Sequence, residues 1–369
     1  MNILIVYLGR KGGGAHYTYE LVNELSKKTN VSLLVSKQAE NIKSYESLNI
    51  SLNTINTFNG MFSFILSSFK LPFIKNKIKK IILDEKIDIV ISTMTHVWNG
   101  FIFTPNFMMK IPYILTIHDA VPHSGEGNFI LNLLNNKDIK NANAYIALTE
   151  HVKNQFINIY GDKKDICILP LGSFNFKSGE IKSWCGVRPL RILFFGRIHE
   201  YKGIDLLLDS MIILQEKYDL ELSIYGQGDL SDYVDKIDVI KKINIENRWI
   251  GDSEVGDILQ AHDVCVIPYK DASQSGVIPV AQSAGLPTIV NPVDGLIEQI
   301  EKDKTSLVTD RVDSVSLALS IEKIIKNPEL VNKLSIGSLE YASKKLSWVP
   351  IVNKLITYSK ETLNSSDRS

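Results

Sequence analysis

Two cations that follow a short apolar run, Arg197 and Lys202, are the first residues of this chain whose types and spacing indicate chemistry. The run ILFF ends at Gly196, and apolar residues recur at helical spacing soon after Lys202. This order predicts a buried strand, a tight turn and a helix start, which would place both cations and free backbone N–H groups at the carboxyl edge of a sheet. Such a place binds phosphate. A surface turn with two solvated charges is the alternative.

A run of glycines follows the first apolar run and precedes a predicted helix: Gly12, Gly13 and Gly14, with His16 two residues later. Because glycine has no Cβ, these backbone amides can approach an anion at a helix start. A dinucleotide site would need G-x-G-x-x-G and an acidic residue after the second strand, whereas the spacing here is G-x-x-G-G-G and the second run leads to Lys37. We therefore do not expect NAD, and a flexible turn remains the alternative.

Two histidines stand at the ends of apolar runs. His118 follows PYILTI and is itself followed by Asp119, and His96 ends the phrase STMTH. An imidazole at the carboxyl end of a buried strand would face a ligand cleft, although a lone histidine is more often structural.

Apolar runs of strand length alternate with helix-length segments along the whole chain, which predicts parallel sheets wrapped by helices. We expect a first series, a polar linker without periodicity at 177–188, and a second series. The first series covers 3–8, 31–35, 87–92, 112–118 and 144–149, and the second covers 191–196, 220–226, 247–251, 263–269, 287–291 and 306–310. The last segment, 347–358, predicts an amphipathic helix with Trp348, Ile351, Leu355 and Tyr358 on one face.

Composition excludes several classes of protein. The 369 residues fit two domains, and a formal net charge of +0 gives no overall field that would favour nucleic acid. Three widely spaced cysteines fit neither a disulfide framework nor a zinc site, so we expect a reducing cytosol. The start MNILIVYLG reads as a first strand and not as a signal peptide, and no apolar run is long enough to span a bilayer.

The phrase around the two cations resembles the signature GR-x-x-x-x-KG-x-x-x-L of family 4 glycosyltransferases. Arg197, Lys202, Gly203 and Leu207 fall on the matching positions, and TIHD and SW…Y resemble two further phrases of that family. The resemblance implies a GT-B fold of the α/β class, with two Rossmann-like doubly wound domains facing a central cleft. We expect an acceptor-side domain at 1–178, a nucleotide-sugar domain at 186–345 and a C-terminal helix at 346–369 that crosses back to the first domain.

The resemblance also implies roles for individual residues. Arg197 and Lys202 would hold the donor diphosphate, and His118 would hydrogen-bond the donor sugar and its diphosphate. The further candidates are Gly13, Gly14 and Gly226 for the donor, Trp249 and Ile250 for its base, and Gly12, His16 and His96 on the acceptor side.

The segment ASQSGVIPVAQSAGLP departs from the family. Aligning it on Gly285 places Ala272 and Val280 where the family carries the two glutamates of E-x7-E. Hydrogen-bonding residues of an SQSG phrase stand at this helix start instead, and the N–H groups of Ser275, Gly276 and Val277 are further candidates for phosphate contact. We interpret the chain as a variant branch of the family.

Residues 59–80 mix four phenylalanines with five lysines. This mixture fits either an anionic membrane surface or a lipid-linked acceptor, or else a helix that packs its phenylalanines on the sheet and leaves its lysines in solvent.

These observations predict a glycosyltransferase that moves a sugar from a nucleotide-diphosphate donor, a UDP-sugar, to a carbohydrate or lipid-linked glycan. The family implies retention at the anomeric carbon. It also implies a role in the biosynthesis of a bacterial surface polysaccharide, such as lipopolysaccharide or capsule, in the cytoplasm at the inner face of the membrane. The sequence has no D-x-D phrase, so we expect neither a metal nor a cofactor. A UDP-sugar epimerase and a non-catalytic homologue that binds or activates a partner are the alternatives.

Overall fold

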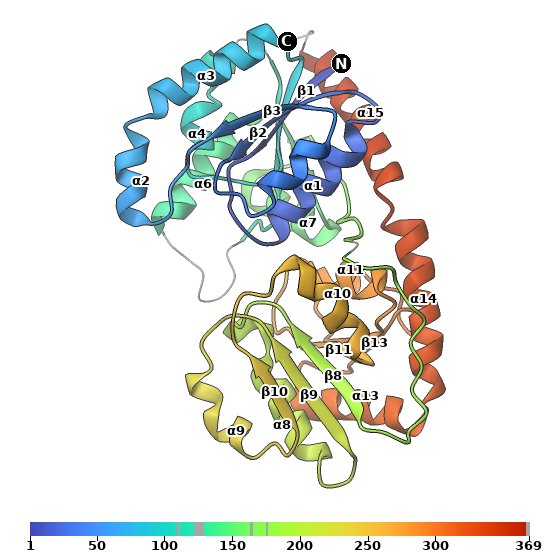
Figure 1. The fold of residues 1–369 in the computed structure, drawn as a ribbon. Helices are drawn as coiled ribbons and strands as arrows, with labels where there is room; N and C mark the ends of the chain where they lie inside the picture. Colours follow the sequence, from blue (N-terminus) through green and yellow to red (C-terminus); the bar gives the residue numbers. More distant parts are fainter. Residues whose placement is uncertain (109–110, 122–128, 163–164, 175, 367–369) are drawn as a thin grey trace. The chain divides into compact units, whose positions relative to one another are not determined.

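The computed structural model describes residues 1–108, 111–121, 129–162, 165–174 and 176–366 (Figure 1). The chain divides into two compact units. The first contains the described residues up to Gly172 together with 348–366, and the second contains 173–347.

The first unit is built on a seven-stranded sheet in the order β3-β2-β1-β4-β5-β6-β7, in which every pairing is parallel. Its central strands are nearly continuous apolar runs because helices cover a parallel sheet on both faces. The side chains of Ile3, Leu4, Ile5 and Val6 in β1 are fully buried. The strands are β1 (Asn2–Tyr7), β2 (Asn30–Ser36), β3 (Ser51–Ile55), β4 (Ile89–Ser92), β5 (Tyr113–Ile117), β6 (Ala144–Ala147) and β7 (Ile166–Ile168). The helices are α1 (Gly13–Leu25), α2 (Met61–Ser68), α3 (Leu71–Asp84), α4 (Asn99–Ile102), α5 (Pro105–Met108), α6 (Phe129–Asn141), α7 (Glu150–Tyr160) and α15 (Trp348–Ser366).

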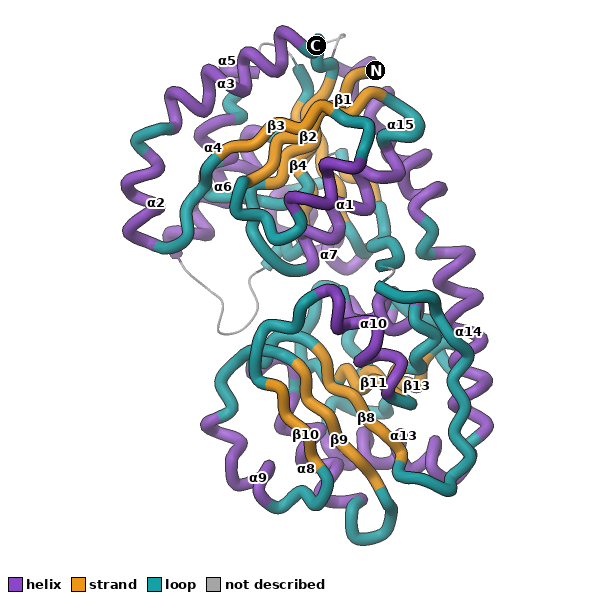
Figure 2. Tube along the Cα trace, viewed as in Figure 1, coloured by secondary structure: helices purple, strands orange, loops and turns teal. Residues whose placement is uncertain are grey.

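The second unit repeats this plan with a six-stranded parallel sheet in the order β10-β9-β8-β11-β12-β13, flanked by helices (Figure 2). The strands are β8 (Leu190–Phe195), β9 (Leu220–Tyr225), β10 (Ile243–Glu246), β11 (Val264–Ile267), β12 (Thr288–Val290) and β13 (Ser306–Val308). The helices are α8 (Ile204–Leu214), α9 (Val234–Asp238), α10 (Asp252–Ala261), α11 (Val277–Ser283), α12 (Asp294–Ile297), α13 (Ser314–Lys326) and α14 (Glu329–Lys345). The prediction of two parallel α/β sheets is confirmed.

One predicted strand is wrong. Residues 247–251 form a loop, and the strand of this region is β10, which lies four residues earlier at the edge of the sheet. No residue of β10 is fully buried, and polar residues are tolerated at such positions. Its sequence INIE accordingly lacks the apolar run that marks the central strands. The apolar pair Trp249 and Ile250 drew the prediction to the loop instead.

The linker predicted at 177–188 contains neither helix nor strand, and it is fixed along the second unit. The Lys182 ammonium donates to the Gln260 carbonyl at 2.8 Å, and the Lys182 N–H donates to the Ser335 hydroxyl at 2.7 Å. Earlier still, the Ser173 N–H donates to the Leu346 carbonyl at 2.8 Å. The main segment of the second unit begins at 173, whereas the sequence analysis ends the first domain at 178 and begins the second at 186.

The C-terminal helix predicted from 347–358 is present as α15 and belongs to the first unit. It packs along α1, and its Tyr358 hydroxyl donates to the Asp165 carbonyl at 2.9 Å. Among the described residues, no helix has both the length and the apolar run that crossing a bilayer requires.

Candidate functional site

In the second unit, Arg197 and Lys202 lie beyond the end of β8, at the carboxyl edge of the sheet. Gly196 follows β8 directly with φ +116°, a conformation that side chains rarely adopt, and the chain there turns away from the strand direction. The Arg197 side chain is exposed and that of Lys202 is half-buried. Both cations therefore stand where open α/β sheets bind ligands.

Lys202 is held over an aromatic ring from the neighbouring strand. Its ammonium lies 3.8 Å from the centroid of Tyr269, which follows β11, and 5.0 Å from that of Tyr201. Tyr269 is 1% exposed, and burial raises the pKa of its hydroxyl; the charge of Arg197 acts on the same pKa in the opposite direction. Lys202 is thus placed over Tyr269 at the β8–β11 edge, and the cation–π contact fixes the position of the ammonium.

The glycines around this edge let backbone segments meet. Gly203 has φ +68° at the start of α8, and a Cβ there would overlap the Pro268 carbonyl oxygen. A Cβ on Gly226, where φ is +157°, would overlap the carbonyl oxygen of Gly196. Gly226 was predicted as a place of ligand approach, and in the structure the segment that approaches it is the main chain after β8.

The SQSG segment uses two of its three candidate N–H groups internally. The Ser275 N–H donates to Gln299 Oε1 at 2.7 Å, while Gln299 Nε2 donates back to the Ser275 carbonyl at 3.0 Å. The Val277 N–H donates to the Ser275 hydroxyl oxygen at 3.2 Å. These two N–H groups therefore already have partners, whereas Gly276 is exposed. Contact of Ser275 and Val277 with a donor stays a prediction.

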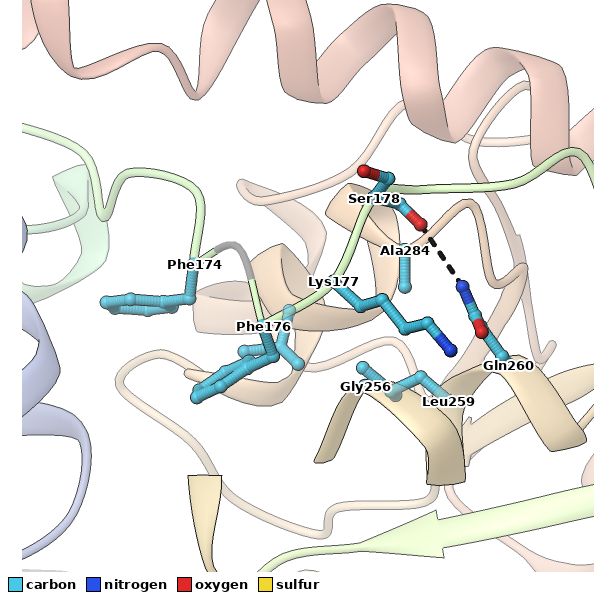
Figure 3. Close-up of a pocket in the computed structure, with 9 residues that line it drawn as sticks. Phe174, Phe176, Lys177, Ser178, Gly256, Leu259, Gln260 and Ala284 are labelled. Carbon is cyan, nitrogen blue, oxygen red and sulfur yellow. Dashed lines mark hydrogen bonds between the residues drawn. The ribbon is translucent and has the colours of Figure 1, made fainter. Parts of the chain in front are cut away.

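Apolar side chains stand at the two positions aligned with the glutamates. Ala272 is 1% exposed and Val280 is 7% exposed. Val280 lines a narrow crevice at helices α10 and α11 that is also lined by Phe174, Phe176 and Lys177, and Phe176 and Lys177 lie against Gly256 (Figure 3). The linker thus packs against the position where the family's second glutamate would stand.

The residues predicted to contact the base lie in the loop after β10. Trp249 is 37% exposed and Ile250 is buried. Arg248 holds this loop, since its guanidinium lies 2.6 Å from a Glu254 carboxylate oxygen and 3.1 Å from one of Glu246. Asn247 is anchored in the same way, because its side-chain amide both accepts from and donates to the Gly228 backbone.

In the first unit, the glycine loop lies at the carboxyl end of β1. Gly12 has φ +85°, and its N–H donates to Glu40 Oε1 at 2.6 Å. The same carboxylate oxygen lies 3.9 Å from His16 Nε2. Gly13 is exposed, whereas a Cβ on buried Gly14 would lie 2.9 Å from the Met94 sulfur. A carboxylate beside Gly12 disfavours a phosphate there and suits the hydroxyl groups of a sugar.

His118 follows β5 and is oriented by two neighbours. Its Nε2 lies 2.8 Å from the Thr93 carbonyl oxygen, and Tyr17 contacts it edge-on with ring centroids 5.5 Å apart. Because a carbonyl can only accept, Nε2 carries the proton and Nδ1 the lone pair. Burial lowers the pKa of His118, against the opposing effects of the Thr93 carbonyl and Asp119, which favours the neutral ring.

His96 lies in an aromatic cluster after β4. It stacks on Phe58 with ring centroids 5.5 Å apart and accepts the Trp98 N–H on Nδ1 at 3.3 Å. Burial, with a smaller effect of the Arg10 charge, lowers the pKa of His96 to about 3. The order β1-β4-β5 brings the glycine loop, His96 and His118 to one edge of the sheet. Within the described part of the chain, no group of His, Cys, Asp or Glu residues is arranged to hold a metal ion.

Two family models match the chain. "Glycosyltransferase Family 4" matches residues 11–172, which carry the glycine loop and His118, and "Glycosyl transferases group 1" matches residues 189–327, which carry Arg197 and Lys202. Together they span most of the chain. The chain belongs to the family 4 glycosyltransferases.

Solved structures share the fold of this family 4 member. Sucrose-phosphate synthase from Thermosynechococcus elongatus superposes with a TM-score of 0.76 at 16% identity and 99% coverage of both chains. Anabaena HepE in complex with UDP and glucose superposes with a TM-score of 0.76 at 14% identity, over 96% of this chain and 98% of that one. The fold is therefore GT-B.

Curated relatives match at higher identity than these structures do. The uncharacterized glycosyltransferase MJ1607 of Methanocaldococcus jannaschii is 24% identical over 48% of this chain and 46% of its own length, so this family 4 chain spans less than half of that relative. CapM of Staphylococcus aureus, a capsular polysaccharide biosynthesis glycosyltransferase, is 25% identical over 63% of this chain and 67% of its own.

Sequence reasoning missed four residues that shape these two edges: Tyr269, Gln299, Glu40 and Thr93. Each acts on a predicted residue that is 24 or more positions away, as with Glu40 on Gly12 and Gln299 on Ser275. Tyr269 alone carried a usable signal, because an aromatic residue directly after a strand lies at the same sheet edge as the family 4 cations.

Proposed function

We propose that this glycosyltransferase transfers a sugar from a UDP-sugar to a carbohydrate or lipid-linked glycan acceptor, with retention at the anomeric carbon, in the assembly of a bacterial surface polysaccharide. The observation that carries the proposal is the placement of Lys202 over Tyr269, with Arg197 two residues after the end of β8, at the carboxyl edge of the second sheet. The UDP bound to HepE and the role of CapM in capsular polysaccharide biosynthesis support the choice of donor and pathway.

The two cations act on the leaving group. When the bond between the anomeric carbon and the diphosphate oxygen breaks, negative charge develops on the diphosphate. A guanidinium and an ammonium already in place stabilise that charge without reorganisation, which is usually the largest single contribution to catalysis. In this proposal they do so without a bound metal.

The edge of the first sheet would receive the sugars. The ring of His118, oriented by Thr93 and Tyr17, would lie beside the donor sugar. Glu40, between Gly12 and His16, is an acceptor for hydroxyl protons on the acceptor side. These groups orient sugars, whereas the cations of the second unit hold the diphosphate.

A thermal-shift screen of nucleotide diphosphates and their sugars tests the donor. A ligand at a hundred times its Kd stabilises the folded protein by about 2.7 kcal/mol. UDP and a UDP-sugar should raise the Tm, and ADP and GDP at the same concentration should not. Stabilisation by GDP or ADP alone would refute the UDP assignment, and the absence of any nucleotide effect would refute the donor site.

A second function is favoured by the apolar pair Ala272 and Val280, which lack the charge of the family's glutamates. A non-catalytic homologue would bind a donor and bind or activate a partner. NMR of the chain with a UDP-sugar, alone and with glycan acceptors, separates the cases: product formed only with an acceptor indicates a transferase, conversion without one an epimerase, and binding without turnover a non-catalytic homologue.

A further inference from the structure

Helices α2 and α3 of the first unit present large apolar side chains to solvent. Phe62 is 77% exposed, Phe69 77% and Phe73 75%. We call these three, together with Ile65, Leu66 and the lysines at 70, 77, 79 and 80, the α2–α3 surface. Figure 1 shows both helices along one side of their unit, away from α1 and α15.

The apolar face of α2 points outward. Phe62, Ile65, Leu66 and Phe69 follow the spacing i, i+3, i+4 and i+7, which places them on one face of a helix, and each is more than half exposed. A surface helix of a soluble domain normally turns such a face to the core.

The polar side chains of α2 point inward or cap the helix. The Ser68 hydroxyl oxygen accepts the indole N–H of buried Trp98 at 3.0 Å, and the Ser63 hydroxyl oxygen accepts the Gly60 N–H at 2.9 Å. Phe64, on the inner face, packs against the core. The second alternative from the sequence, in which the phenylalanines pack on the sheet, therefore holds for Phe64 and fails for Phe62, Phe69 and Phe73.

Positive charge surrounds this apolar face. Residues 59–83 contain five lysines and no acidic residue. On α3, Lys77 and Lys80 stand four and seven residues after Phe73 and share its outer face, while Ile74, Ile78 and Ile81 are buried beneath. In the described part of the chain, none of the five lysines is paired with a carboxylate.

A groove beside Phe73 gathers the charge. It runs between α3 and the end of β3 and is lined by Lys37, Lys70, Lys77 and Phe73, among others. The Lys77 ammonium is held at its edge by the Thr54 carbonyl at 2.7 Å. Three lysine residues line this mainly apolar groove, a combination that suits an anionic headgroup whose acyl chain lies against phenylalanine.

We propose that the α2–α3 surface docks this chain onto an anionic lipid bilayer. The phenylalanines enter the boundary between headgroups and acyl chains, and the lysines contact the phosphates. Charge complementarity favours a bilayer over a second copy of this chain, because two such surfaces facing each other would oppose lysines with lysines. The inference goes beyond the transferase reaction and does not depend on it.

Co-sedimentation of the full chain with vesicles tests the proposal. We expect binding to vesicles of phosphatidylcholine with 30% phosphatidylglycerol to be at least about tenfold tighter than to phosphatidylcholine alone, and to weaken as NaCl is raised. Each of Phe62, Phe69 and Phe73 contributes about tenfold to the vesicle binding constant. Replacing all three with serine should therefore weaken vesicle binding by about a hundredfold or more. Lys79→Glu with Lys80→Glu should weaken binding by about 25-fold or more.

A matched control uses exposed residues of the second unit. Val315 and Leu319 on α13 are 59% and 56% exposed, and changing both to serine together with Lys302→Glu removes apolar surface and reverses a charge elsewhere. This control should bind vesicles as wild type does. All variants should keep the wild-type melting temperature within about 2 °C, since the changed side chains lie on the surface.

Three results would overturn the proposal: equal binding to neutral and anionic vesicles, no vesicle binding, or unchanged binding of the triple serine variant. Sedimentation velocity tests the remaining possibility, that a second copy of this chain occupies the α2–α3 surface. A wild-type chain that forms dimers, without binding vesicles, and a triple serine variant that stays monomeric would assign the surface to contact between copies.

Discussion

Replacement of Lys202 by alanine should separate catalysis from stability. The variant removes an ammonium that lies 3.8 Å from the centroid of the buried Tyr269 ring, a contact that contributes about 1–2 kcal/mol to the free energy of unfolding. It also removes a positive charge from the proposed diphosphate site, and loss of one such group raises the transition-state free energy by about 2.7–4 kcal/mol, or 10²–10³ in kcat. Turnover should therefore fall far more than stability.

The assay compares kcat with the best UDP-sugar and the free energy of unfolding in urea for three variants. Arg197→Ala should lose turnover on the same scale as Lys202→Ala. Lys270→Ala is the matched control, because Lys270 follows Tyr269 and forms an ion pair with Asp205 at 2.8 Å. Loss of that surface pair should cost about 0.2–1 kcal/mol of stability and leave turnover within about threefold of wild type.

Turnover within about threefold of wild type in both Lys202→Ala and Arg197→Ala, with both variants folded, would remove the two cations from the diphosphate site. A Lys270→Ala variant as inactive as Lys202→Ala would also contradict the assignment, since any cation at this edge would then have the same effect.

Three further predictions concern single side chains. His118→Ala should lower kcat more than donor affinity, measured by steady-state kinetics and calorimetry, and an unchanged kcat would leave the residue a structural role. Burial raises the pKa of Asp138 to about 7. Between about pH 4 and pH 7 the folded chain therefore keeps a proton that the unfolded chain has already released, and the free energy of unfolding of the wild type falls as the pH rises through this range. Asp138→Asn should therefore gain about 3 kcal/mol of stability relative to wild type from pH 5 to pH 8 in urea unfolding, and a constant difference would contradict the assigned pKa. Gly226→Ala should lower the free energy of unfolding by about 2–4 kcal/mol, because its Cβ would overlap the Gly196 carbonyl. Gly276→Ala should change it by less than about 0.5 kcal/mol, because nothing lies within 4 Å of the added carbon. Equal melting temperatures of the two variants would refute this prediction.

The local order of elements could be predicted from the sequence, because a strand buried on both faces must be a nearly continuous apolar run. RILFFG and PYILTIH show this pattern and form β8 and β5. The edge strand β10 could not be found in this way, since its half-exposed positions tolerate polar residues.

The long-range contacts of the site could not be predicted. The sequence placed Arg197 and Lys202 at the end of a strand, but not the ring of Tyr269, 67 residues further on, beneath the ammonium. The sequence suggested that the Ser275 N–H contacts a phosphate, but this N–H donates to Gln299 Oε1. The local sequence around neither residue predicts this hydrogen bond. Such contacts depend on which loops meet at a sheet edge.

The hydrogen bond from Ser173 to Leu346 closes the second unit at its own base. Residues 173–347 therefore enter and leave through adjacent points, as an inserted domain does. In the first unit the corresponding chain ends are also adjacent, because Gly172 lies directly against the indole of Trp348. Each half could thus be made as a separate polypeptide, the first by splicing Gly172 to Trp348, and nucleotide capture could be measured in the second half without the remainder of the enzyme.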